Sequence, residues 1–173
     1  MITSRTDMND AKTRNSLPVV TFDDDMSLHF NGEEIKLVHY ANGHTDTDSI
    51  VFFTKSNVVH MGDHFFVNAF PFVDTANGGD VEQYIKNVRA VLADLPDDVQ
   101  IIPGHGPLAT KAVLQSWIDG VAESVEILRP GIESGKSAKD LIEAGLPAKF
   151  DDWGKGFVST NRWIGIVHSS LSN

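Results

Sequence analysis

Residues 43–64, GHTDTDSIVFFTKSNVVHMGDH, form the stretch from which the rest of the chain is interpreted. Two apolar runs within it, residues 49–54 and 58–61, are rich in β-branched and aromatic side chains and are joined by three polar residues. That spacing predicts a β-hairpin. A glycine-containing turn with His44 precedes the hairpin and a second, with Asp63, follows it. The stretch therefore places two candidate metal ligands beside buried strands.

A third segment, Pro103-Gly104-His105-Gly106-Pro107, follows a predicted strand over residues 100–102. Glycine lets the backbone turn sharply beside a ligand, and a strand end holds the side chain rigidly. A single histidine in such a loop, or a single Gly-Asp turn, is ordinary. Imidazole and carboxylate suit zinc, manganese or iron, and two histidines with one aspartate leave positions open for water or substrate. We therefore predict a metal site made of His44, Asp63 and His105.

Hydrophobic periodicity predicts strands and helices around these segments. Strands are expected at residues 19–22 and 34–40, around the turn residues Asn31 and Gly32. Helices are expected over residues 81–95 after a cap at Asp80, from Thr110 to Pro130, from Ser137 to Ala144, and from Ser159 to the end. Strands followed by helices indicate an α/β or α+β fold, with one domain over residues 19–173 after a polar lead of residues 1–18.

Composition narrows the function classes. The chain has 14 Lys and Arg against 24 Asp and Glu, a net charge of −10, and no basic tract, which disfavours nucleic-acid binding. It has no cysteine, so imidazole and carboxylate must hold any metal. The polar opening predicts neither a signal peptide nor a membrane span, and localisation stays open between periplasm and cytoplasm.

In order and context, Gly-His-Thr, a hairpin ending in Gly-Asp, a helix and Pro-Gly-His-Gly resemble the latter half of the metallo-β-lactamase superfamily. The resemblance covers residues 19–173 and implies half of an αββα sandwich. It implies that His44 binds a first metal, that Asp63 bridges two metals and is the residue on which catalysis depends, and that His105 binds the second. The implied enzyme is a zinc hydrolase with one or two ions, in which metal-bound hydroxide attacks an ester, amide, lactam or related bond of a small molecule.

The family also carries an earlier His-x-His-x-Asp-His segment, and the sequence has none. Its nearest string, His60 to His64, lacks the middle histidine, so His60 and His64 are kept only as alternative ligands. Half a sandwich would leave one sheet face uncovered, and a homodimer that covers this face and pools ligands is expected. The alternative is a catalytically impaired module that binds metal or self-associates.

Other side chains near the motifs have supporting roles in this interpretation. Asp48, and with less support Asp46, are expected to accept hydrogen bonds from the ligand imidazole or from nearby amides. Four phenylalanines follow Asp63, and they either pack in the core or at a dimer contact or else line a substrate pocket; they are Phe65, Phe66, Phe70 and Phe72.

Overall fold

A computed structural model describes residues 18–172, so the polar lead, apart from its last residue, lies outside the described part of the chain. The described residues form a mixed α/β fold with a six-stranded sheet and four α-helices, as the sequence predicts. The elements are β1 (Asp25–Phe30), β2 (Glu33–His39), β3 (Ser49–Phe53), β4 (Val58–Phe66), η1 (Thr75–Asn77), α2 (Val81–Asp94), β5 (Gln100–His105), β6 (Ala109–Thr110), α3 (Lys111–Glu133), α4 (Ala138–Ala144), η2 (Ala148–Phe150), η3 (Trp153–Lys155) and α5 (Thr160–Leu171).

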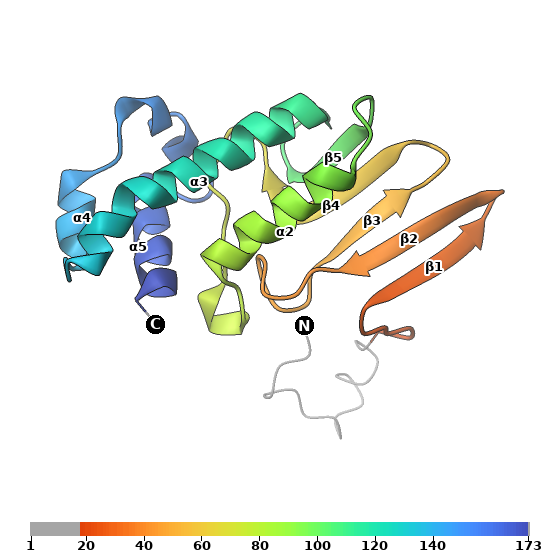
Figure 1. Ribbon diagram of the computed structural model, residues 1–173, viewed down its shortest axis with the longest axis horizontal. Helices are drawn as coiled ribbons and strands as arrows, with labels where there is room; N and C mark the ends of the chain where they lie inside the picture. Colours follow the sequence, from red (N-terminus) through yellow and green to blue (C-terminus); the bar gives the residue numbers. More distant parts are fainter. Residues whose placement is uncertain (1–17, 173) are drawn as a thin grey trace, which may run out of the picture.

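The strands follow one another across the sheet in chain order. Strands β1 to β4 form an antiparallel meander, β5 runs parallel to β4, and β6 pairs antiparallel with β5. The parallel step needs a crossover, and α2 supplies it. Helices α2 and α3 lie together on one face of the sheet, over β4 and β5 (Figure 1). The carboxyl ends of β4 and β5 consequently lie at the same edge.

The central hairpin and the turn at Asn31 and Gly32 form where predicted, both turn residues having positive φ. Three strand predictions were wrong. The strand predicted over residues 100–102 continues to His105 as β5. Residues 19–22 are not a strand, and the first strand begins at Asp25. Strand β4 does not stop at Met61 but continues past a register shift at Gly62, because the buried Phe66 beyond it pairs with His105 of β5.

Local capping fixes the helix starts as expected. The side chains of Asp80, Thr110 and Ser137 each accept a hydrogen bond from a backbone N–H three residues on. The predicted end of α3 was wrong, because the helix passes through Pro130 to Glu133. Val113, in the first turn of α3, is 38% exposed. None of the helices in residues 18–172 is both long and apolar enough to cross a bilayer.

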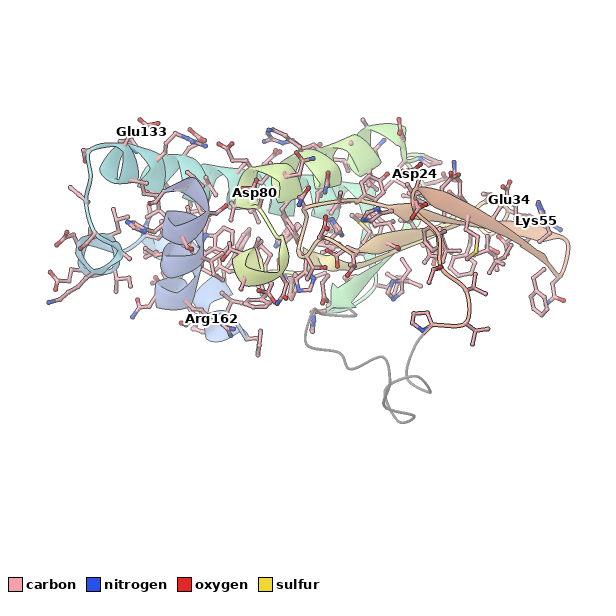
Figure 2. All side chains as sticks on the ribbon, turned by 90° about the horizontal axis from the view of Figure 1, so that it is seen from below. Asp24, Glu34, Lys55, Asp80, Glu133 and Arg162 are labelled. Atoms are coloured by element: carbon pink, nitrogen blue, oxygen red, sulfur yellow. The ribbon has the colours of Figure 1, made fainter. Side chains whose placement is uncertain are left out.

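The hydrophobic core lies between the sheet and the helices. Ile50, Val59 and Ile101 are fully buried on the helix-covered face, against Leu114 and Ile118 of α3. The side chains that alternate with them in the strand register point to the other face, where no described helix lies (Figure 2). We call this the open face; its apolar residues are Met26, Leu28, Phe30, Ile35, Leu37, Val51, Phe53, Val58 and Ile102, none of which belongs to the core or packs against it.

Candidate metal centre

The loop between β2 and β3 holds His44 in one orientation. Its Nδ1 lies 3.1 Å from Oδ1 of Asp48, while the other oxygen of Asp48 accepts hydrogen bonds from the backbone N–H of Thr45, at 2.5 Å, and from its hydroxyl, at 3.1 Å. Asp48 therefore ties the ring to the loop backbone. With Nδ1 engaged in this way, Nε2 is the nitrogen of His44 that faces the site.

The pKa values of His44 and Asp48 are shifted in opposite directions. Burial acts to lower the pKa of His44, but the hydrogen bond and negative charge of Asp48, helped by Asp63 and Asp74, outweigh it and raise the pKa. Burial likewise acts to raise the pKa of Asp48, but the hydrogen bonds from His44 and Thr45 prevail and lower it. The two side chains thus form a charge-assisted pair.

Asp63 and His105 come from the neighbouring ends of β4 and β5. The prediction that Asp63 lies in a turn was wrong: it lies within β4, just after Gly62 with its φ of +51°. His105 is the last residue of β5, and its ring stacks on Phe66 with 4.6 Å between centroids and 11° between planes. A Cβ on Gly104 would collide with the carbonyl of Gly62 and lie 2.7 Å from Oδ1 of Asp63. Glycine at position 104 is therefore what lets these strand ends approach.

The structure brings His44, Asp63 and His105 together. Nε2 of His44 lies 3.6 Å from Oδ2 of Asp63, and Nε2 of His105 lies 3.2 Å from Oδ1 of the same carboxylate. Within residues 18–172, no three His, Asp or Glu side chains are grouped as ligands of a single ion. The pairwise distances are consistent with that finding, because the two histidines meet different oxygens of Asp63. The donor set fits two adjoining half-sites, each with an imidazole and a shared carboxylate, and each short of a full set of ligands.

Asp46 and His60, which were also predicted, lie apart from the contacts between His44, Asp63 and His105. The Asp46 side chain is exposed, and it is the Asp46 backbone carbonyl that lies 2.7 Å from Nε2 of His39. His60 is exposed on the side of the open face, and its Nδ1 accepts from the N–H of Gly62 at 3.2 Å. Of the two supporting aspartates expected from sequence, Asp48 contacts His44, whereas Asp46 has no described hydrogen bond to that ring.

His64 is buried directly beneath the site. It is 0% exposed, and within the described chain neither ring nitrogen has a hydrogen-bond partner. The ring stacks on Tyr84 of α2, whose hydroxyl donates to the backbone carbonyl of Asp63 at 3.1 Å. Burial lowers the pKa of His64 to about 4, so the ring is neutral near pH 7. Sequence reasoning missed this buried position, since Met-Gly-Asp-His shows no sign of which face α2 will cover.

Aromatic side chains wall one side of the centre. Phe65, Phe66 and Phe70 are buried in the core, as one of the two sequence interpretations held. Phe72 instead stands edge-on to His44, with 5.8 Å between ring centroids. The guanidinium of Arg162, from the first turn of α5, lies over Phe72 and over Phe157. No motif in the sequence pointed to Arg162.

Comparison with known proteins tests the fold. No protein-family model and no curated protein matches the chain. Among solved structures, a metallo-β-lactamase from Pontibacter korlensis matches with a TM-score of 0.53 and 20% identity, covering 61% of this chain and 49% of its own. The chain has part of a metallo-β-lactamase fold. A double mutant of the sec-alkyl sulfatase PisA1 matches 89% of this metallo-β-lactamase-like chain and 26% of its own, with a TM-score of 0.69 and 13% identity.

A third solved structure, TMB-1, matches with a TM-score of 0.50 and 19% identity over 61% of this chain. The chain spans about half the length of the Pontibacter enzyme and of TMB-1, and about a quarter of the sulfatase. The predicted resemblance is thereby confirmed at the level of the fold. At these identities the similarity to the metallo-β-lactamase and sulfatase structures shows the fold and nothing further.

Proposed function

We propose that this chain is a metal-dependent hydrolase that acts on an ester, amide, lactam or related bond of a small molecule. The observation that carries the proposal is the approach of two imidazole Nε2 atoms to the two oxygens of Asp63. Zinc suits this donor set, with manganese or iron as the alternatives. One ion or two would be held by His44 and His105, with Asp63 shared between them.

The chain's own residues prepare the site for this role. Asp48 fixes the tautomer and direction of His44, so that Nε2 is presented without a search over ring orientations. Phe66 stacks on the ring of His105, and Phe72 packs edge-on against the ring of His44. When bound, the metal would supply a Lewis acid for the scissile carbonyl and a water of lowered pKa.

The remaining ligands, we propose, come from a second copy of the chain packed on the open face. Nine apolar side chains stand there, whereas the whole chain carries a net charge of −10, and depletion of charge is typical of an interface core. The open face, made of five strands of about six residues, has an area on the order of 500 Å² in each copy. A dimer would therefore bury on the order of 1,000 Å² in total. A two-fold axis parallel to the strands would bring both sites to the same edge.

A second candidate function rests on the same open face. Each half-site has only two donors from the described residues, so the chain could instead self-associate or bind metal weakly without catalysing a reaction. The two candidates differ in turnover, and they share the requirement for a covered face.

The test measures zinc content by elemental analysis, mass by light scattering, and turnover of nitrocefin, p-nitrophenyl acetate, p-nitrophenyl sulfate and bis-p-nitrophenyl phosphate. Bound zinc in a dimer, with turnover abolished by Asp63→Asn and kept in the hairpin-turn control Lys55→Ala, supports the hydrolase. A folded dimer that takes up zinc but turns over none of the four supports the non-catalytic candidate. A folded protein that binds no zinc refutes the metal centre itself.

A further inference from the structure

Arg162 occupies a corner between two aromatic rings at the rim of the candidate metal centre. Its Cζ lies 4.6 Å from the ring centroid of Phe72 and 4.8 Å from that of Phe157, and the two rings stand at 85° to each other. Figure 2 shows Arg162 at the end of α5 that points away from α3. Because Phe72 also meets the ring of His44, a single phenyl ring separates the guanidinium from the imidazole.

The charge of Arg162 is left uncompensated. In the part of the chain that is described, Arg89 pairs with Asp119, and Arg129 pairs with Glu82 and Glu126, but no carboxylate pairs with the guanidinium of Arg162. This is unusual for a chain with 24 acidic residues against 14 basic ones. The side chain is exposed, so its N–H groups are open to a solute.

The packing of Arg162 between two aromatic rings and its unpaired charge both suit the binding of an anion. Aromatic faces hold a guanidinium by cation–π attraction while leaving its N–H edge free, and that planar edge matches an oxyanion with two parallel hydrogen bonds. The aspartates around His44 would repel an anionic substrate, so a fixed cation beside them offsets the repulsion locally. A lysine in the same corner would offer only a point charge.

We propose that Arg162 is a substrate-binding residue that recognises an oxyanion group, namely a carboxylate, sulfate or phosphate. The substrate class of the proposed hydrolase is then an anionic ester or amide whose charged group lies one aromatic ring away from the bond that is cleaved. This inference rests on the proposed function for the reaction, but the anion site itself is independent of turnover.

The anion site is tested by nitrogen-15 NMR of the arginine Nε–Hε signals, without metal, during titration with acetate, sulfate or phosphate against sodium chloride of equal ionic strength. The Arg162 signal should shift in a saturable way with the oxyanions and not with chloride, while the ion-paired Arg129 signal stays still. Phe157→Ala, which keeps the arginine and removes half of the corner, should weaken the apparent affinity severalfold. A shift that follows ionic strength alone, or that is equal at Arg129, would overturn the proposal.

A kinetic comparison separates binding from structure. Arg162→Lys and Arg162→Gln should raise the KM for mono-p-nitrophenyl succinate about tenfold, the factor that corresponds to one charge-assisted hydrogen bond, and leave the KM for p-nitrophenyl acetate unchanged. Equal effects on both esters would mean that Arg162 only packs on the rings. If zinc binding and turnover are absent while the oxyanion shift persists, the proposed function fails and the anion site stands. An active, zinc-loaded enzyme with no oxyanion response refutes this inference alone.

Discussion

The imidazole of His64 lies flat on the phenol ring of Tyr84, with 3° between the ring planes and 5.4 Å between their centroids. Both rings are fully buried, and burial also raises the pKa of the Tyr84 hydroxyl. The stacked pair forms the floor of the site, because Tyr84 donates to the carbonyl of Asp63 and His64 follows Asp63 in β4. The properties of this floor can be tested without any metal.

Acidification should destabilise the metal-free protein through His64. Between its folded pKa of about 4 and its ordinary value of 6.5, the unfolded chain binds a proton that the folded chain does not. The free energy of unfolding should therefore fall as the pH drops through this window, by up to about 3 kcal/mol. Urea denaturation from pH 7 to pH 4.5, with chelator present, measures the slope, and His64→Leu should flatten it. The same slope in both proteins would show that another group is responsible.

Gly43→Ala should unsettle the loop that carries His44. A Cβ at position 43 would collide with Nε2 of His64 and lie 3.2 Å from Nδ2 of Asn87. Forcing a methyl group into this packed contact should cost about 1–3 kcal/mol of stability. The matched control is Gly165→Ala in α5, where a Cβ meets nothing within 4 Å and the helix should gain about 1 kcal/mol. Equal effects of the two substitutions in thermal denaturation would contradict the contact.

Asp63→Asn should remove zinc binding while the apo fold persists. An amide cannot serve both histidines as an anionic bridge, and the side chain of Asp63 is 38% exposed, so little core packing is lost. We expect zinc affinity to fall by at least about 100-fold, the upper end of the effect of removing an outer partner. Isothermal titration calorimetry measures the change and circular dichroism the fold. Unchanged zinc affinity in a folded variant would mean that the ion is held elsewhere.

Leu28→Lys should convert a dimer into a monomer. Leu28 is 48% exposed on the open face, and a lysine there would bury an unpaired charge from each copy in the apolar contact. Ser27→Lys is the matched control, because Ser27 is the adjacent residue of the same strand on the opposite face and is exposed. Light scattering should give half the mass for Leu28→Lys only. A wild-type chain that is monomeric at millimolar concentration would end the dimer proposal.

Local signals in the sequence were sufficient for the helix starts and the central hairpin, and they singled out the three segments that carry His44, Asp63 and His105. The caps at Asp80, Thr110 and Ser137 act over three residues, and glycine or asparagine marked the turns, so each could be predicted from neighbouring residues. The glycine-containing segments beside predicted strands were likewise enough to predict one site made of His44, Asp63 and His105. The length of β4 was not predictable in this way, because pairing with β5 carries it past Gly62.

Only the tertiary structure decided which side chains are buried and which stand beside the site. His64 is buried because α2 places Tyr84 against it, and Arg162 reaches the rim because α5 returns to the loop that holds Phe72. Ile35 and Leu37 lie on one apolar face of β2, and the helices covered the opposite face of the sheet and left this one open. Such outcomes depend on contacts between residues far apart in the chain, whereas caps, turns and strand periodicity are set by residues only a few positions apart.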